Sequence, residues 1–258
     1  MTEAVGKAAL ERALDEHEDL VLLYQPIHDA RTGAVFSAEA LLRQRRENGE
    51  LREASIIHEA AEEGPGSELF TLDHILVQKA YTAAAGWQAA HPDVHLNVNL
   101  SPREFQEGNV LDRLGKLITS CGIDTTRVNI EITETAYIEQ PEETMEVLGA
   151  LRKLGVELWL DDFGSGHSSL THLQHFPVDA IKLPGSFVKP LPDGARCRAI
   201  VAALIHLAHD LGLSVTAEEV ERQEQLDFLL EHDCDYIQGF LFNRPMEAED
   251  FRRLLDRG

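Results

Sequence analysis

The chain has 258 residues, 43% of them hydrophobic, which is enough for one large domain with a sizeable core. Asp and Glu number 45 against 23 Lys and Arg, and the formal net charge is -22. Because such a surface repels nucleic acid phosphates and anionic membranes, we expect no binding to a nucleic acid duplex. An anionic small ligand would need bound cations or a local basic pocket to offset this repulsion.

The cysteines and the hydropathy pattern indicate a cytoplasmic protein without a membrane span. Cys121, Cys197 and Cys234 are widely spaced and match neither a disulfide framework nor a metal motif. The first twenty residues lack the apolar core of a signal peptide. No segment approaches the roughly 20 apolar residues that a membrane helix needs.

Apolar runs of strand length alternate with amphipathic helical patterns along the chain. The predicted strands are residues 21–25, 35–42, 94–99, 128–132, 157–161, 180–182, 214–218 and 236–238. The predicted helices are residues 68–90, 110–120, 142–154, 195–211, 223–231 and 248–255. This alternation predicts an α/β fold, a (β/α)8 TIM barrel, whose usual size is about 250 residues.

The connection between the first two predicted strands is too short for a regular barrel. It includes only PIHDARTGA, whereas a parallel crossover needs about a dozen residues or more. We therefore expect an antiparallel first strand pair and a modified barrel. No linker, repeat or low-complexity segment divides the chain, so residues 1–258 are expected to form one domain with a helical lead-in over residues 1–20.

Polar side chains stand at or just after the end of nearly every strand from the second onward. In TIM barrels the active site lies at the carboxyl ends of the strands, so these side chains are expected to converge there. They are Glu39, Asn99, Glu131, Asp161, Asp162, Lys182, Glu218, Glu221 and Gln238.

So many buried carboxylates would be very unfavourable without cations. Oxygen ligands suit Mg²⁺ or Mn²⁺, and the lack of convergent Cys or paired His argues against a zinc thiolate site. Two ions would explain the adjacent aspartates, with Asp161 bridging both and Asp162 serving one. Such a pair typically clamps the oxygens of a phosphoryl displacement, and Lys182 would hold the attacking water or neutralise developing charge.

Each of these residues also has an ordinary structural interpretation. A single Asp or Glu at a strand end is commonly a helix cap or a solvated loop charge. The stretch DDFGSG at residues 161–166 equally fits a turn with capping aspartates. The metal-site interpretation therefore depends on the convergence of six or more positions, and so on the strand assignments.

Eight short motifs follow one another over nearly the whole chain. They are YQPI at 24–27, EALLR at 39–43, NLS at 99–101, EITET at 131–135, DDFGSGHSSL at 161–170, IK at 181–182, AEEVE at 217–221 and QGF at 238–240. In this order they resemble the EAL-domain cyclic di-GMP phosphodiesterase family. The resemblance implies a barrel with an antiparallel first pair, and hydrolysis of cyclic di-GMP to linear pGpG with Mg²⁺ or Mn²⁺.

The resemblance also implies roles for single residues. The implied ligands of two metal ions are Glu39, Asn99, Glu131 and Asp161, with Asp162 and Glu218 completing the second site. Lys182 would contact the nucleophilic water, while Glu221 and Gln238 would support the centre. Implied substrate contacts are Gln25, Pro26, Leu41, Arg43 and Asp162. Thr133 and Glu134 would brace the loop after DDFG, which in the family couples the site to a dimer interface, so a homodimer is expected.

Four positions depart from the family's usual motifs. Pro184 replaces an Asp two residues after the lysine, which removes a carboxylate and a backbone N–H. Glu219 replaces a Gly, which predicts strain if the backbone there needs a glycine conformation. His167 replaces a Tyr and would make activity sensitive to pH near neutrality. Gln44 stands where a Trp is frequent.

Two functions other than catalysis stay open. Pro184 and Glu219 are compatible with a catalytically weak receptor that binds cyclic di-GMP and acts through a partner. A scaffold that binds another protein and no nucleotide is also compatible with the fold, since fold does not determine function. The retained ligand acids favour the enzyme.

Overall fold

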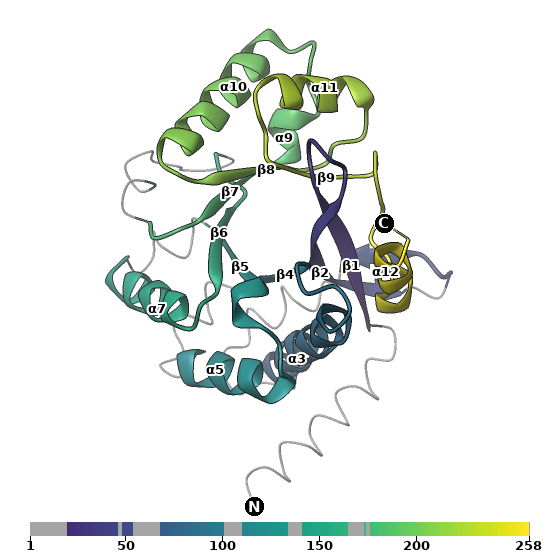
Figure 1. Ribbon diagram of the computed structural model, residues 1–258, viewed down its shortest axis with the longest axis vertical. Helices are drawn as coiled ribbons and strands as arrows, with labels where there is room; N and C mark the ends of the chain where they lie inside the picture. The colour runs from purple at the N-terminus through teal and green to yellow at the C-terminus, as the bar shows by residue number, and fades with distance from the viewer. Residues whose placement is uncertain are drawn as a thin grey trace, which may run out of the picture.

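The structure is a computed structural model that describes residues 20–45, 48–53, 68–100, 110–133, 141–164, 173 and 176–257. Within these residues, eight strands close into a barrel (Figure 1). The barrel strands are β1 (Leu20–Asp29), β2 (Val35–Arg45), β4 (His95–Asn99), β5 (Val128–Thr133), β6 (Glu157–Asp161), β7 (Ala180–Leu183), β8 (Ser214–Ala217) and β9 (Tyr236–Gln238).

The strand directions confirm the modified barrel. Strands β2, β4, β5, β6, β7, β8 and β9 run parallel to one another in that order, whereas β1 runs antiparallel to both of its neighbours, β2 and β9. The β1–β2 hairpin forms because the short connection allows no crossover. A short strand that was not predicted, β3 (Leu51–Glu53), extends the sheet antiparallel to β2.

Helices surround the ring of strands (Figure 1). They are α3 (Glu68–Gln88), α5 (Val110–Cys121), α7 (Pro141–Lys153), α9 (Gly185–Val188), α10 (Ala195–Asp210), α11 (Gln223–Glu231) and α12 (Ala248–Leu255), with a 3-10 turn η1 (Thr125–Arg127). No helix in the described ranges is long and apolar enough to cross a membrane.

The predicted elements agree with the structure to within a few residues at their ends. The main difference is β1, which was expected to end at Gln25 and runs to Asp29. Pro26 lies inside this strand and pairs with Ala38. The predicted lead-in over residues 1–20 lies almost wholly outside the described residues, so the prediction of one domain over residues 1–258 stays a prediction.

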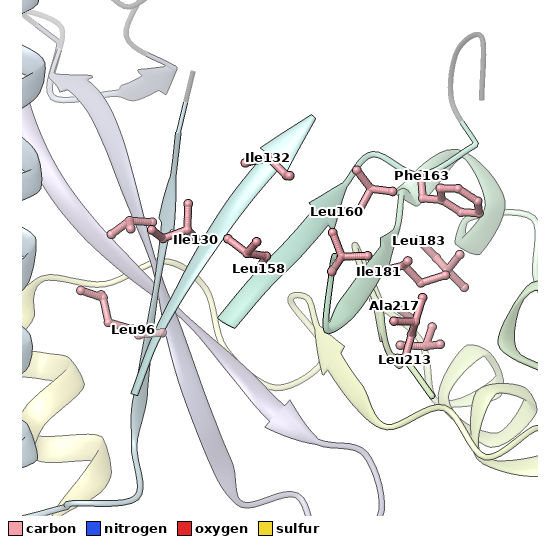
Figure 2. Close-up of a cluster of buried hydrophobic side chains, with 14 of the residues drawn as sticks. Leu96, Ile130, Ile132, Leu158, Leu160, Phe163, Ile181, Leu183, Leu213 and Ala217 are labelled. Atoms are coloured by element: carbon pink, nitrogen blue, oxygen red, sulfur yellow. The ribbon is translucent and has the colours of Figure 1, made fainter. Parts of the chain in front are cut away.

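The outer faces of the strands form the main hydrophobic core. Alternate strand residues point outward toward the helices, as the two-residue period of a strand requires. Figure 2 shows this layer on neighbouring strands and just beyond their ends: Leu96, Ile130, Ile132, Leu158, Leu160, Phe163, Ile181, Leu183, Leu213 and Ala217. Within each strand, the residues that alternate with these point into the barrel.

An aromatic cluster fills part of the barrel interior. Phe36 stacks on Tyr236 with ring centroids 4.1 Å apart, and Trp159 packs beside both rings. Trp159 precedes Asp161 by two residues, and Tyr236 likewise precedes Gln238. The aromatic cluster therefore lies one layer below the side chains at the carboxyl ends of these strands.

Candidate functional site

Lys182 lies at the centre of four carboxylates inside the barrel. Its Nζ atom is 2.7 Å from Glu218, 2.9 Å from Glu131, 3.2 Å from Asp161 and 3.3 Å from Glu39. The lysine side chain is only 1% exposed. The structure thus brings together five residues that the sequence analysis placed at strand ends.

Strand register explains the convergence. Each of these side chains comes from a different strand or from the residue directly after one: β2, β5, β6, β7 and the end of β8. Glu131 pairs with Asn99 of β4, and Asp161 pairs with Thr133 of β5. Parallel strands in this register point their inward side chains into one layer at the same end of the barrel.

Burial and mutual repulsion dominate the electrostatics of the cluster. Burial, and then the nearby Glu39 carboxylate, raise the pKa of Glu131 well above its usual range. Burial opposes the charged form of Lys182, yet the surrounding carboxylates, Glu131 first, outweigh it and raise the lysine pKa well above its usual value. Lys182 is therefore an ammonium group, and the carboxylates around it exceed its single charge.

Within this cluster, Glu39 accepts hydrogen bonds from the side chains of Asn99, Gln238 and Lys182. Asn99 donates to its Oε1 at 3.0 Å, and Gln238 donates to its Oε2 at 2.7 Å. Burial opposes ionisation, but Lys182, Gln238 and Asn99 outweigh it and hold the pKa of Glu39 below its usual value. Glu39 is accordingly a fixed, ionised carboxylate.

In contrast to Glu39, two further acids have a raised pKa. Burial, followed by repulsion from Asp161 against the attraction of Lys182, raises the pKa of Glu218 to about 7. Burial and repulsion from Asp161 also raise the pKa of Asp162. Asp162 itself adopts a left-handed conformation with φ of 54° and is exposed at the end of β6.

The donor set fits a hard divalent cation in its chemistry. It consists of carboxyl and amide oxygens, and its four carboxyl groups surround a single ammonium group. The described part of the chain contains no group of three or more His, Cys, Asp or Glu side chains already arranged to hold a metal ion. Lys182 is the positive charge that lies between these acids in the structure.

Several other predicted residues lie on the β1–β2 hairpin and at the end of β5. Gln25 pairs with Glu39 across the β1–β2 hairpin, and Pro26 is buried beside it. Leu41 and Arg43 lie further along β2, where the Arg43 guanidinium donates to the carbonyl of Leu42. Thr133 ends β5, next to Asp161 in register.

Glu221 is less directly connected to the cluster. Glu221 is exposed, and its backbone N–H is held by the side chain of Gln225. Glu134 and His167 lie outside the described residues.

The departures at residues 184 and 219 meet at the start of α9. Pro184 is buried and forms the N-cap of this helix. Glu219 has φ of 52°, the left-handed conformation that glycine adopts without strain. Its carboxylate pairs with Lys189 at 2.5 Å on the surface, where both side chains are at least half exposed.

Sequence reasoning missed three buried polar residues that adjoin the cluster: His95, Asn97 and Asn129. Asn97 donates to Glu131 at 2.7 Å, and all three side chains are buried. The available signal was the alternation of polar residues in HLNVN and VNIE, which marks inward positions of strands that are otherwise apolar.

Comparison with known proteins agrees with this arrangement. The EAL domain family model matches residues 7–245. Cyclic di-GMP phosphodiesterase NbdA of Pseudomonas aeruginosa is 34% identical over 248 residues, covering 95% of this chain and 31% of NbdA. The chain spans about a third of the length of the curated relatives it matches first.

Solved structures extend the likeness to the fold. The PaMucR phosphodiesterase, in complex with c-di-GMP, has a TM-score of 0.85 at 30% identity, over 95% of this chain and 99% of that chain. A manganese and cy-diGMP complex of Klebsiella pneumoniae BlrP1 has a TM-score of 0.75 at 30% identity, over 88% of this chain and 56% of that chain. The family model covers most of the sequence, and the chain therefore belongs to the EAL domain family.

Proposed function

We propose that this chain hydrolyses one phosphodiester bond of cyclic di-GMP, giving linear pGpG, with Mg²⁺ or Mn²⁺. The observation that carries the proposal is the convergence of Glu39, Glu131, Asp161 and Glu218 on Lys182 at the carboxyl ends of the barrel strands. Family membership and the c-di-GMP complex of PaMucR support the substrate.

The chain's own residues would divide the work as follows. Glu39, Asn99, Glu131 and Asp161 would hold one cation, and Asp162 with Glu218 would complete a second site. Bound divalent cations would acidify a coordinated water and neutralise charge on the phosphoryl oxygens. Gln238 and Asn99 hold the Glu39 carboxylate in one orientation, which reduces reorganisation during turnover.

Lys182 would act beside the cations. Its raised pKa keeps it charged, and its amine hydrogens already point at the carboxylates that face the reaction centre. An ammonium in this place would orient the attacking water and stabilise charge on the phosphoryl group. Gln25, Pro26, Leu41 and Arg43 would contact the dinucleotide along the β1–β2 hairpin, with Asp162. Glu221 would support the centre, and Thr133 and Glu134 would brace the loop after β6.

A receptor that binds cyclic di-GMP with weak turnover is the second candidate. It is favoured by one specific observation: Lys182 already pairs with four acids. In that case the dinucleotide would still bind, but cations would have to compete with the ammonium group.

The test is direct hydrolysis by the purified chain. Cyclic di-GMP is supplied with Mg²⁺ or Mn²⁺, and pGpG is followed by chromatography, with EDTA and Glu39→Ala as controls. Metal-dependent pGpG that both controls abolish, with the fold of Glu39→Ala retained by circular dichroism, supports the enzyme. Micromolar binding by calorimetry without product in either metal supports the receptor. Light scattering in the same samples tests the predicted homodimer.

A further inference from the structure

A continuous chain of hydrogen bonds runs through the barrel interior to Glu131. Arg127 Nη1 lies 3.0 Å from His95 Nε2, and His95 Nδ1 lies 3.1 Å from Asn129 Oδ1. Asn129 Nδ2 donates to Asn97 Oδ1 at 2.9 Å, and Asn97 Nδ2 donates to Glu131 Oε1 at 2.7 Å. None of these four bonds has a role in the predicted chemistry.

The Arg127 end of this hydrogen-bond chain determines the direction of every bond. A guanidinium group can only donate, so His95 Nε2 must be the acceptor and carry no proton. His95 Nδ1 then carries the proton of the neutral ring and donates to Asn129 Oδ1. Both asparagine amides are oriented by the same logic: Asn129 Oδ1 accepts from His95, so Asn129 Nδ2 donates to Asn97 Oδ1, and Asn97 Nδ2 donates to Glu131.

The side chains that link Arg127 to Glu131 in this hydrogen-bond chain are buried, which strengthens the effect of their common direction. Asn97 and Asn129 are fully buried, and His95 is 4% exposed. Asn97 and Asn129 are also directly paired in the register of β4 and β5. In a medium of low polarity, successive hydrogen bonds that point the same way strengthen one another. The positive end of this series faces Glu131.

The surroundings of His95 favour its neutral form. Burial lowers its pKa, Arg127 also lowers it, and Asn129, Glu157 and Asp124 act in the opposite direction. Phe36 stacks on the imidazole ring with centroids 4.5 Å apart. The end of the hydrogen-bond chain that lies away from Glu131 reaches the surface, where Arg127 pairs with Asp93 at 3.2 Å.

We propose that Arg127, His95, Asn129 and Asn97 form a one-way hydrogen-bond chain that positions Glu131 for cation binding. This proposal rests on the proposed function. Asn97 engages Oε1 of Glu131, which leaves Oε2 as the oxygen that faces Lys182 at 2.9 Å. The chain therefore selects which oxygen is presented to a cation and prevents the carboxylate from rotating. Asn97 is a positioning residue in this scheme, since it acts through Glu131.

The first test is the protonation of the His95 ring. In protein labelled with ¹⁵N-histidine, long-range ¹H–¹⁵N spectra distinguish the two neutral tautomers and the imidazolium. We expect His95 to carry its proton on Nδ1 between pH 6 and 8 in metal-free protein. A proton on Nε2, or a doubly protonated ring at pH 7, would overturn the one-way chain.

The second test is Mn²⁺ binding without substrate, followed by calorimetry. Asn97→Ala should weaken Mn²⁺ affinity by about tenfold or more, the usual effect of removing a residue that orients a metal ligand. Asn243→Ala is the matched control, because Asn243 also bonds a buried histidine, His28 at 2.9 Å, and neither residue is a predicted metal ligand. Asn243→Ala should lose stability and keep the wild-type Mn²⁺ affinity.

A third variant covers the case in which Asn97→Ala does not fold. Arg127→Gln alters the half-exposed end of the chain and should abolish the exclusive Nδ1–H tautomer while weakening Mn²⁺ binding by a smaller factor. Wild-type Mn²⁺ affinity in both Asn97→Ala and Arg127→Gln would overturn the positioning role. If the wild type itself binds no Mn²⁺, the proposed function fails and the positioning role fails with it, while the tautomer still decides whether the one-way chain exists.

Discussion

The ammonium nitrogen of Lys182 lies 2.7 Å from a carboxylate oxygen of Glu218, in a layer of the barrel that holds three further acids. Lys182→Met removes the one positive charge of this cluster. In EDTA we expect the unfolding free energy to fall by about 3–5 kcal/mol, because an unpaired buried charge is strongly destabilising. Mn²⁺ should restore part of the loss. Urea denaturation with and without Mn²⁺ measures both effects.

Lys189→Met is the control for this experiment. Lys189 also pairs with a glutamate, Glu219, but its side chain is 59% exposed. Its loss should leave the denaturation midpoint within error of the wild type. Equal midpoints for Lys182→Met and the wild type in EDTA would contradict the proposed charge balance.

Glu218 predicts a pH dependence for the metal-free protein. Its pKa of about 7 in the folded chain lies above the ordinary 4.5 of the unfolded chain. Between these pH values the folded state binds more protons than the unfolded state. The contribution of protonated Glu218 to the unfolding free energy is therefore full below about pH 4.5 and is lost as the pH rises through 7. Glu131 and Asp162, whose pKa values are also raised, act in the same direction.

The contribution of Glu218 can be isolated by comparison with Glu218→Gln. In EDTA, the wild type should lose about 1–3 kcal/mol more unfolding free energy than the variant between pH 5 and 7.5. Because the raised pKa values of Glu131 and Asp162 also affect the stability profile, only the difference between the two proteins is informative. Parallel stability profiles would show that Glu218 is ionised throughout this range.

The contact between Gly185 and Glu219 predicts a coupled pair of substitutions. A Cβ atom added to Gly185 would lie 2.9 Å from the Cβ atom of Glu219 and closer still to its carboxylate. Gly185→Ala should therefore destabilise the protein by about 1–3 kcal/mol through overpacking. In the background of Glu219→Gly, which also relieves the left-handed conformation, the same substitution should have an effect close to zero.

A double-mutant cycle by urea denaturation measures this coupling. Gly149→Ala serves as the control, because Gly149 lies in α7 and an added Cβ would meet nothing within 4 Å. That substitution should stabilise the protein slightly, since alanine favours a helix. If Gly185→Ala cost the same in both backgrounds, the Glu219 side chain would not be the obstacle.

The barrel was predictable from sequence because its information is local. Apolar runs of strand length identified all eight barrel strands, and the nine residues that include the first turn excluded a parallel connection. The acids at the strand ends were predictable for the same reason: a parallel barrel gathers its strand ends on one face. Glu39, Glu131, Asp161, Lys182 and Glu218 were placed together on this ground alone.

The missed features depend on contacts between distant segments. Helix α9 has four residues, and β3 has three, so neither carries a periodic pattern of its own. The series of hydrogen bonds that links Arg127 to Glu131 through β4 requires the register of β4 against β5, which no local pattern specifies. The sequence alone therefore assigns no partner to Asn97 or Asn129.

Gln225 provides a further prediction, at the loop that follows Glu218. Its Oε1 accepts hydrogen bonds from the backbone N–H groups of Glu221 and Arg222, both at 2.9 Å. Its Nε2 donates to the carbonyl of Val188 at 3.1 Å, and the residue is 2% exposed. Gln225 thus joins the start of α11 to the end of α9.

Gln225→Leu keeps most of the volume and removes all three hydrogen bonds. One buried and two partly buried backbone groups would lose their partner, so we expect a loss of about 1–3 kcal/mol of unfolding free energy. Gln225→Glu keeps the acceptor and loses the donor to Val188, and should be intermediate. Gln223→Leu, on the exposed side of the same helix, should change the stability by less than about 0.5 kcal/mol. A Gln225→Leu protein as stable as Gln223→Leu would mean that water replaces the glutamine at these backbone groups.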